Sequence, residues 1–278
     1  MTAPLTAYAT AYGPGRPIWA VDIGGTKSLL GRFVGRKLTV AAVIRTPDDP
    51  ALLAGWVRRQ FPRGTAQLGI AFPGGLDENG RVTTWPSRPG WSGYRLRDEL
   101  GRIAHTVVLR DDCESAAAGE ITRGIAKGRS DAFVAVLGTE LSGALVLDGK
   151  VRRTVTAEPR TLGHLAILPG GSCRCGGTGC AQLALRTLPA DDRLGARLEG
   201  WPDGLRLLTF LGDLARFLTV PTVVLTGGLL ARPVLRAQLR VRMEAYGVEV
   251  LVPTRPGLSS LLGAAVLEPA GGAGRAPL

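Results

Sequence analysis

The amino-acid sequence predicts an α/β protein made of two lobes with a cleft between them. The order strand–strand–strand–helix–strand–helix occurs twice along the chain, which indicates two halves of similar construction. The length of 278 residues is enough for two α/β domains, since such domains usually have about 100–200 residues. Two halves that face each other leave a cleft, which is the usual place for a ligand.

In the first half, short apolar runs alternate with turns and with longer amphipathic segments. The first run, 18–21, ends at Asp22 and the turn that follows it, and it predicts a strand. Further strands are predicted at 29–34, 38–44, 68–72 and 106–109. Helices are predicted at 50–61, 94–103 and 113–124.

The second half repeats this order around a Gly- and Cys-rich loop at 169–179. Its predicted strands are 132–137, 144–147, 222–225 and 248–252. Its predicted helices are 181–188, 205–218, 233–246 and 258–267. Glycine-containing turns separate these elements, as expected where the chain reverses direction.

The composition is that of a globular enzyme with a hydrophobic core. Hydrophobic residues make up 45% of the chain and charged residues 21%. Apolar runs stay shorter than the roughly 18–20 residues that span a bilayer. Residues 1–17 lack the basic start and apolar block of a secretion signal, so we expect a cytoplasmic protein without a membrane partner.

The net charge of +11 raises the question of a nucleic-acid partner. The basic residues are mostly arginine and are scattered rather than gathered in a stripe. This distribution favours a general surface property, which can help to attract an anionic nucleotide. We therefore expect no nucleic-acid partner. DNA binding, the alternative, would show a steep salt dependence.

A glycine-rich turn, Asp22-Ile-Gly24-Gly25-Thr26-Lys27, joins the first two predicted strands. Paired glycines let the backbone come close to a phosphate, so that its N–H groups can face the anion. Asp22 adds a carboxylate that can hold a hydrated Mg²⁺ ion. A plain hairpin turn is the alternative reading of the same residues.

Three of the four cysteines lie within eight residues, at Cys173, Cys175 and Cys180. This spacing is too local for a disulfide framework and is typical of a metal site in a reducing compartment. His164, nine residues before Cys173, can complete a tetrahedral Zn²⁺ site of three sulfurs and one nitrogen. Four protein ligands close such a site, so the zinc would be structural. Three buried thiols and a core histidine are the alternative.

Several of these motifs follow one another in an order that resembles the ROK family. They are the turn from Asp22 to Lys27, the segment 69–74, Gly163-His164, the Cys-x-Cys-Gly-x-x-Gly-Cys run and Thr226-Gly227-Gly228. The family groups bacterial sugar kinases and related repressors on an actin-like (ribonuclease H-like) ATPase fold. The resemblance covers about residues 18–267, and it implies ATP contacts at Gly138 and Thr139 and at Gly227 and Gly228.

The resemblance also implies a division of the chain. Residues 18–111 would form a small N-terminal α/β lobe that the helix 258–267 completes. Residues 112–257 would form a large α/β lobe that carries the zinc-binding loop. We expect residues 1–17 to be a flexible tail and residues 268–278 to be disordered.

Two adjacent acids, Asp111 and Asp112, lie between a predicted strand and the start of a helix. By themselves these acids favour a role in helix capping. The family carries Asn-Asp here, eight residues before a Glu, and Asp112 precedes Glu120 by eight residues. The resemblance therefore implies that Asp112 is the general base of phosphoryl transfer and that Asp111 accepts a sugar hydroxyl.

The chain departs from the family pattern around both ligands. The second phosphate loop, usually Gly-Thr-Gly-x-Gly-Gly-Gly, contains Glu140, a carboxylate that would repel phosphates. On the sugar side, Thr161 replaces a Glu, with Glu158 near enough to substitute for it, and Gln182 replaces a second Glu. Ser87 replaces an Asn in the sugar loop. These changes alter the partners of the sugar hydroxyls, on which specificity depends.

The resemblance implies ATP- and Mg²⁺-dependent phosphorylation of a primary hydroxyl of a sugar or sugar-like molecule. The acceptor would be a hexose, an amino sugar or a C7-cyclitol, and His164 would both bind zinc and contact it. The family also implies a homodimer, by analogy alone. A ROK-type pseudokinase or sugar-binding protein without phosphoryl transfer is the alternative function.

Overall fold

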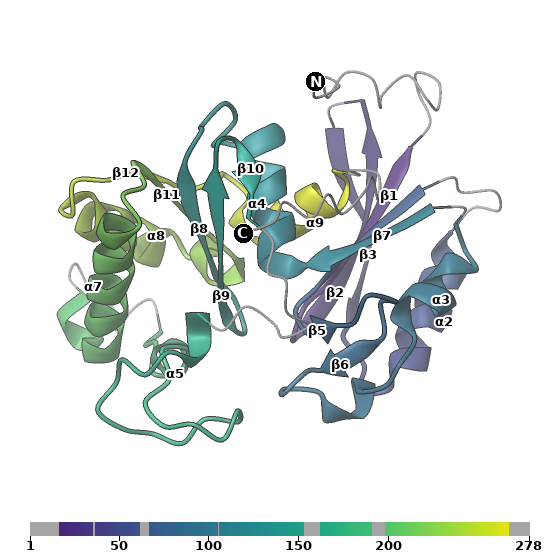
Figure 1. Cartoon of the computed structure of the whole chain (residues 1–278), viewed down its shortest axis with the longest axis horizontal. Coiled ribbons are helices and arrows are strands. Elements are labelled where there is room, and N and C mark those ends of the chain that lie inside the picture. Colours follow the sequence, from purple (N-terminus) through teal and green to yellow (C-terminus); the bar gives the residue numbers. More distant parts are fainter. Residues whose placement is uncertain are drawn as a thin grey trace, which may run out of the picture.

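The computed structural model describes residues 17–35, 37–61, 67–104, 106–152, 162–190 and 198–266. Two five-stranded sheets lie side by side, with helices between them and on their outer faces (Figure 1). The tails predicted at 1–17 and 268–278 fall outside these ranges apart from Pro17, and so do the predicted sugar contacts Glu158 and Thr161. Within the described ranges, no helix has the length and apolar character that crossing a membrane requires.

The first sheet has the strand order β3-β2-β1-β4-β7. β1 (Ile18–Ile23) lies in the middle and pairs antiparallel with β2 (Lys27–Val34) and parallel with β4 (Gln67–Phe72). β3 (Lys37–Arg45) and β7 (Thr106–Asp111) form the two edges. Because β1, β4 and β7 run parallel, their carboxyl ends meet at one edge of the sheet.

The second sheet repeats this arrangement in the order β10-β9-β8-β11-β12. β8 (Ala132–Leu137) is the central strand and pairs antiparallel with β9 (Leu141–Leu147) and parallel with β11 (Thr222–Thr226). β10 (Lys150–Val151) and β12 (Glu249–Leu251) are the edges. The predicted duplication of one strand order is thereby confirmed, and it turns the carboxyl ends of the two central strands toward a common cleft.

Helix starts follow local capping signals. Asp49 accepts a hydrogen bond from Ala51 N at 2.8 Å, and Pro50 occupies the first turn of α2 (Pro50–Gln60). The other helices are α3 (Leu96–Gly101), α4 (Asp112–Thr122), α5 (Leu183–Arg186), α7 (Pro202–Phe217), α8 (Pro233–Glu244) and α9 (Ser259–Ala264). A short hairpin of β5 (Gly75–Leu76) and β6 (Val82–Thr84), and the 3-10 turns η1 (Pro89–Trp91), η2 (Leu162–His164), η3 (Leu198–Gly200), η4 (Gly228–Ala231) and η5 (Pro256–Leu258), complete the described elements.

Three predicted helices are shorter than the sequence pattern indicates. The helix predicted at 94–103 is α3, the one at 258–267 is α9, and the one at 181–188 is α5, a single turn. Ala181 N and Gln182 N donate to the carbonyls of Leu165 and Gly163, and the regular helix begins only at Leu183. Tertiary contacts thus override helix propensity at this point.

One predicted loop is also shorter than expected. β9 begins at Leu141, three residues before the predicted strand, because Leu141 pairs with Leu137 across the turn and is buried against the core. The residues between β8 and β9 are therefore Gly138, Thr139 and Glu140 alone. The phosphate loop that the family resemblance implied at 138–144 is in this chain a three-residue turn.

The two sheets are joined through close contact between α4 and α9 (Figure 1). Gly119 of α4 faces Gly263 of α9, and a Cβ built on Gly263 would lie 1.5 Å from Ser115 O, so only glycine fits. Below this contact, Ser259 Oγ donates to the buried carboxylate of Glu120 at 2.6 Å. α9 in turn packs on the first sheet, and α4 packs on the second.

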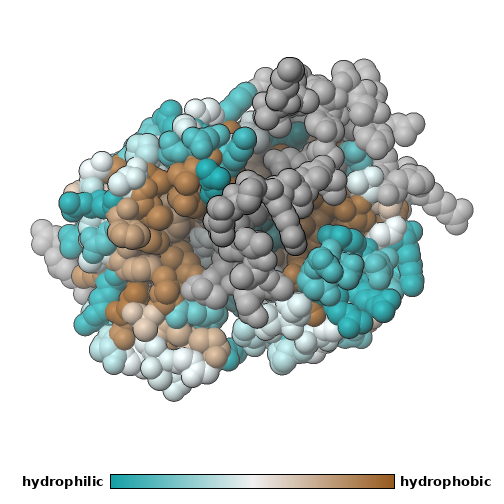
Figure 2. Space-filling model, viewed as in Figure 1, coloured by the Kyte–Doolittle hydropathy of each residue, from teal (hydrophilic) through white to brown (hydrophobic). Residues whose placement is uncertain are grey.

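The largest apolar cluster lies between the second sheet and helices α7 and α8. A groove of about 640 Å³ also runs along α7, where Phe217 is 83% exposed. Figure 2 shows apolar side chains gathered on the half of the molecule that carries α7. The groove is lined by Ile167, Leu205, Arg206, Thr209, Phe210, Asp213, Leu214 and Phe217.

Candidate active site

The carboxyl ends of strands from both sheets open into one cavity of about 430 Å³. Its walls come from the turn after β1, the turn after β8 and the segment after β11. The ends of parallel strands are the usual ligand site of open α/β sheets. The cavity is lined by every residue that was predicted to contact the nucleotide: Asp22, Gly24, Gly25, Thr26, Lys27, Gly138, Thr139, Gly227 and Gly228.

The turn between β1 and β2 is held by residues far from it in the sequence. Thr46 Oγ1 donates a hydrogen bond to Gly24 O at 2.6 Å, and Arg88 Nη2 donates to Gly25 O at 2.8 Å. The hydroxyls of Thr26 and Thr139 lie 2.8 Å apart, within hydrogen-bond distance. The two predicted phosphate turns therefore touch across the cleft.

Gly227 shows why this cavity needs glycine where β11 ends. Its φ angle is +106°, which side chains rarely adopt, and a Cβ there would lie 2.3 Å from Leu137 O. Its N–H donates to Pro256 O at 3.0 Å. The absence of a side chain brings β11 against the end of β8 and leaves the adjacent surface open to the cavity.

Asp22 is the acidic residue of the first turn region. Burial raises the pKa of its carboxyl to about 7, against the opposing effect of the Lys27 charge, which lowers it. A carboxylate that is costly to ionise in the free protein gains from a nearby cation. Its place on the cavity wall therefore suits a divalent metal that accompanies phosphates.

Asp111 and Asp112 lie where β7 passes into α4. Asp111 caps the helix, and its Oδ1 accepts hydrogen bonds from Cys113 N at 2.9 Å and Glu114 N at 3.3 Å. Ser142 Oγ donates to Asp112 Oδ1 at 3.4 Å. Asp111 therefore has the capping role, whereas the carboxylate of Asp112 faces Ser142 of β9 at the cleft wall.

Burial raises the pKa of Asp112 well above its usual range, and the charges of Asp111, Asp22 and Glu140 raise it further. Burial also raises the pKa of Asp111, which the hydrogen bond from Cys113 opposes. A carboxyl whose pKa is shifted upward is a better proton acceptor when it ionises. Burial and mutual repulsion thus make ionisation of these neighbouring acids unfavourable.

A second, small cavity of about 20 Å³ adjoins the first and has room for about one water. Asp112 and Glu140 line both cavities, so they stand between them. Of the predicted sugar contacts, Asp111, Asp112, His164 and Gln182 line the small cavity. Pro73, Pro86, Leu141 and Ser142 complete its wall.

Ser87 was predicted to contact a sugar, but it is not among the residues that line the small cavity. Its Oγ is buried without a hydrogen-bond partner, and it is the neighbouring Pro86 that lines the cavity. The following residue, Arg88, extends to the β1–β2 turn. The loop thus presents proline to the acceptor side, and the family's Asn position faces the protein interior.

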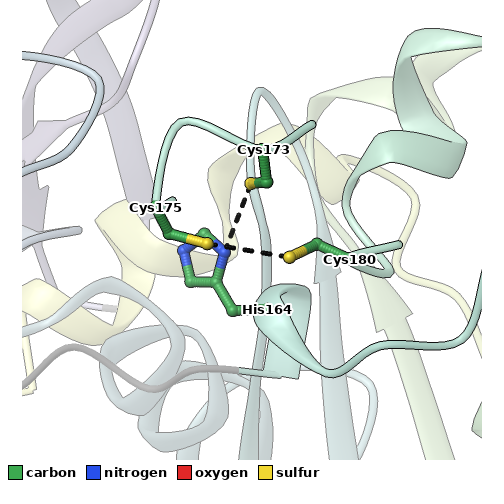
Figure 3. Close-up of side chains that lie close together, drawn as sticks. All are labelled: His164, Cys173, Cys175 and Cys180. Carbon is green, nitrogen blue, oxygen red and sulfur yellow. Dashed lines mark hydrogen bonds between the residues drawn. The ribbon is translucent and has the colours of Figure 1, made fainter. Parts of the chain in front are cut away.

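His164, Cys173, Cys175 and Cys180 converge in one group, with their ligand atoms all within 4.8 Å of one another. Figure 3 shows the three sulfurs gathered around the imidazole ring. Cys173 Sγ lies 3.6 Å from His164 Nδ1, and Cys175 Sγ lies 3.6 Å from Cys180 Sγ. The group could hold a metal ion, as the spacing of the cysteines predicts.

Glycines shape the loop that brings these sulfurs together. Gly176 and Gly179 have φ angles of +88° and +67°, and Cys173 N donates to Gly177 O at 2.9 Å. Gln182 Nε2 donates to Cys173 Sγ at 3.1 Å. An ionised glutamate at this position could not donate such a hydrogen bond to the sulfur.

The protonation of two thiols differs strongly in the absence of metal. Burial raises the pKa of Cys173, but hydrogen bonds from the Cys175 backbone and the Gln182 amide lower it by more, to about 6. Burial, with contacts to Cys175 and Cys173, raises the pKa of Cys180 to about 12. A bound cation would have to displace the proton of Cys180.

Cys113, the cysteine outside the Cys/His group, is fully buried in the α4–β8 cluster. Its Sγ also lies 2.7 Å from Asp111 Oδ1 and 3.1 Å from Gly143 O. The thiol therefore bridges the helix cap to β9. No local motif marks this polar contact or the contacts of Arg88, Thr46 and Ser142, so they could not be predicted from the sequence.

Comparisons with known proteins identify the family. The model of the ROK family matches residues 18–209. The chain belongs to the ROK family. A kanosamine kinase from Amycolatopsis mediterranei is 34% identical over 192 residues, which cover 65% of this chain and 62% of that protein. The chain therefore aligns with less than two thirds of the length of this relative.

Solved structures of ROK proteins share the fold of this ROK chain. A ROK family glucokinase from Streptomyces griseus, in complex with glucose and AMPPNP, has a TM-score of 0.74 at 22% identity, over 90% of this chain and 98% of that one. A ROK hexokinase from Thermus thermophilus has a TM-score of 0.69 at 26% identity, over 90% and 97%. The predicted actin-like α/β fold is confirmed.

Proposed function

We propose that this ROK protein transfers the γ-phosphoryl group of ATP to a primary hydroxyl of a sugar or sugar-like acceptor. The observation that carries the proposal is the position of Asp112, which lines both the large glycine-walled cavity and the small acid-lined one. A general base must reach the acceptor hydroxyl while the nucleotide lies opposite it. A relative named kanosamine kinase and the fold shared with a glucokinase support this reading.

In this proposal the large cavity takes ATP with Mg²⁺. Amides of the turns after β1 and β8 would face the phosphates, and Gly227 and Gly228 would let the adenosine come close to the backbone. Asp22 would bind the hydrated magnesium ion, which supplies charge screening when bound. Lys27 lines the same cavity and can contact phosphate.

The small cavity would take the acceptor after the lobes move apart. Its volume of about 20 Å³ is far below the roughly 300 Å³ of a usual small-molecule site. We propose that residues 18–111 with the last helix, and residues 112–257, form the two lobes. The α4–α9 contact would be the hinge. Closure on the sugar would then exclude water from the reacting hydroxyl.

Asp112 would accept the proton of the hydroxyl as its oxygen attacks the γ-phosphorus in line. The raised pKa of Asp112 suits that task, and the Ser142 hydroxyl, at 3.4 Å, would orient the carboxylate. Asp111 and the ring of His164 line the same cavity and would bind other sugar hydroxyls. Thr161, Glu158 and Ser87 remain sequence-based candidates for the same face.

We further propose that the Cys/His group binds structural zinc. Sulfur atoms about 2.3 Å from a tetrahedral zinc lie about 3.8 Å apart, and sulfur and nitrogen slightly closer. The observed 3.6 Å separations fit this geometry. With three cysteines and a histidine as ligands, the metal would fix the position of His164 at the cavity. Thiols stay reduced in the cytoplasm, so this metal site supports a cytoplasmic location.

The charge of the small cavity favours an acceptor that carries an amino group. Asp111, Asp112 and Glu140 line it, whereas among the described residues no lysine or arginine does. A protonated amine would be attracted by this wall, and a neutral hexose would not. Kanosamine is an amino sugar, so the kinase relative agrees with this preference. Hexoses and C7-cyclitols remain the comparison acceptors.

An acceptor panel tests the proposal. ADP release would be measured with ATP and Mg²⁺ for glucose, glucosamine, N-acetylglucosamine, kanosamine and an aminocyclitol, together with zinc analysis of the protein. We expect ADP release to be fastest with acceptors that carry a free amine. If sugars raise the melting temperature but no acceptor releases ADP, the protein is a ROK-type binding protein without phosphoryl transfer. Light scattering would test the homodimer expected from the family.

A further inference from the structure

Both carbonyl groups of the glycine pair after β1 accept hydrogen bonds from side chains of other segments. Gly24 O accepts from Thr46 Oγ1 at 2.6 Å, and Gly25 O accepts from Arg88 Nη2 at 2.8 Å. In a planar trans peptide the C=O of one residue points opposite to the N–H of the next. The N–H groups of Gly25 and Thr26 are therefore turned away from Thr46 and Arg88.

These two N–H groups belong to residues that line the 430 Å³ cavity. Successive N–H groups turned to one side make a concavity that binds anions. A glycine peptide without such anchors can rotate easily, because glycine restricts its dihedral angles least. The two donors therefore do what the glycines cannot do by themselves, which is to fix the direction of the amides.

Arg88 is built into the protein as a buried anchor. Its side chain is only 11% exposed, pairs with the carboxylate of Asp48, and lies over the ring of Trp85 at 5.6 Å from the centroid. Its Nε is buried without a hydrogen-bond partner. A buried donor without a partner costs stability, so packing alone is a poor reason for an arginine here.

The loop that carries Arg88 also belongs to the acceptor side, because Pro86 lines the small cavity. A bond from this loop to Gly25, 63 positions away, connects the acceptor wall with the phosphate turn. We propose that Arg88 is a positioning residue, which aims the Thr26 amide at the nucleotide phosphates through its hydrogen bond to Gly25 O. This inference rests on the proposed function, since it assigns ATP to the large cavity.

Two substitutions at position 88 test the inference. Arg88→Met removes the donors but keeps part of the aliphatic side chain, and Arg88→Lys keeps the positive charge and a donor group at the end of a shorter side chain. Binding of AMPPNP with Mg²⁺ would be measured by calorimetry without an acceptor. Steady-state constants would be measured with the best acceptor of the panel. We expect Arg88→Met to weaken AMPPNP binding and raise the KM for ATP about tenfold, the scale of a charge-assisted hydrogen bond.

The expected pattern separates positioning from a structural role. The KM for the acceptor should change less than the KM for ATP, and Arg88→Lys should recover part of the affinity. Asp48→Asn, which removes an exposed partner, should stay within about twofold of the wild type. Arg58→Met, at an exposed ion pair of the same lobe, is the matched control and should bind AMPPNP normally.

Three outcomes would overturn the inference. If Arg88→Met lowers the melting temperature but leaves AMPPNP affinity unchanged, Arg88 is only structural. If Asp48→Asn weakens nucleotide binding as much as Arg88→Met, the ion pair and not the bond to Gly25 O is responsible. If the wild type binds no AMPPNP at all, the proposed function fails together with the inference.

Discussion

The side of the cleft proposed for the nucleotide is lined by six glycines and three threonines beside its acids, whereas among the described residues no glycine lines the side proposed for the acceptor, whose wall is built from acids, prolines, His164 and Gln182. The first side holds a cavity of about 430 Å³, and the second only about 20 Å³. The first keeps the predicted glycines, while Gln182, a departure from the family pattern, lines only the second. Glu140 lines both sides.

In the proposed function, the two ligands are recognised by different means. Backbone amides bind phosphate whatever the neighbouring side chains are, provided that the turn keeps its conformation. Side-chain partners decide which hydroxyl or amine is accepted, because an unpaired polar group is costly when buried. Changes of substrate are therefore expected on the acceptor side, and changes of nucleotide affinity where a donor fixes the turn.

The largest effect is expected at Asp112, where the two sides meet. Asp112→Asn should lower kcat by about 10³-fold, because the amide cannot accept the proton of the acceptor. AMPPNP affinity and the melting temperature should not fall. ADP release measures the first and calorimetry the second. Asp98→Asn, at an exposed ion pair, is the control; turnover that survives in Asp112→Asn would show that another group is the base.

The acceptor wall should depend on the metal more than the nucleotide wall does. Cys180→Ser should lose about one equivalent of zinc, and the free energy of unfolding should fall by about 4 kcal/mol, as for a lost structural metal. Cys113→Ser should keep its zinc, since Cys113 is outside the group. Metal analysis with chemical denaturation checks both. Full zinc in Cys180→Ser would contradict the ligand set.

Both walls share the α4–α9 contact, so a change there should affect the whole cleft. Gly263→Ala places a methyl group 1.5 Å from Ser115 O, and the resulting shift should cost about 3 kcal/mol. Gly101→Ala is the matched control, because nothing lies within 4 Å of its added Cβ in α3. Denaturation curves give the difference. Equal stability of the two variants would show that the helices can separate freely.

Asp22 is the buried acid of the nucleotide side, and its pKa of about 7 predicts a pH-dependent effect. Because the pKa of Asp22 in the folded protein lies above the ordinary value of 3.8, ionisation of this carboxyl lowers the free energy of unfolding as the pH rises from about 4 to about 7. The asparagine of Asp22→Asn does not ionise. The free energy of unfolding of this variant, relative to the wild type, should therefore be about 2–3 kcal/mol higher at pH 8 than at pH 5. Melting curves without magnesium test this. An advantage that is the same at both pH values would place the titration elsewhere.

The smallest effect is expected at Glu140, which reaches both sides. Glu140→Gln should reduce the preference for amine-bearing over neutral acceptors by about tenfold, since one of three carboxylates is neutralised. The KM for ATP should fall slightly as repulsion of the phosphates is relieved. Ratios of kcat/KM for glucosamine and glucose provide the measurement. An unchanged ratio would show that the acid wall does not select the acceptor.

Much of the fold could be predicted because its signals are local. Short runs of about ten residues or fewer mark each strand of the duplicated order, the glycine turn after β1 and the Cys-x-Cys run. The extent of the short helices could not be predicted. Ala181 and Gln182 belong to the predicted helix, but the regular helix begins only at Leu183, and these two residues bond to the distant carbonyls of Leu165 and Gly163. β9 likewise begins at Leu141 because of burial against the core.

The functional groups of the cleft could be identified from the sequence alone. They are a glycine turn that can bind anions, two adjacent acids at a helix start, and cysteines and a histidine spaced for a metal. The tertiary structure alone decided that Arg88 anchors Gly25 and that Asp112 and Glu140 stand between two cavities. Residue types and short spacings can be read directly from the sequence. Contacts across many residues arise only when two sheets pack against α4 and α9, because packing and not spacing brings their side chains together.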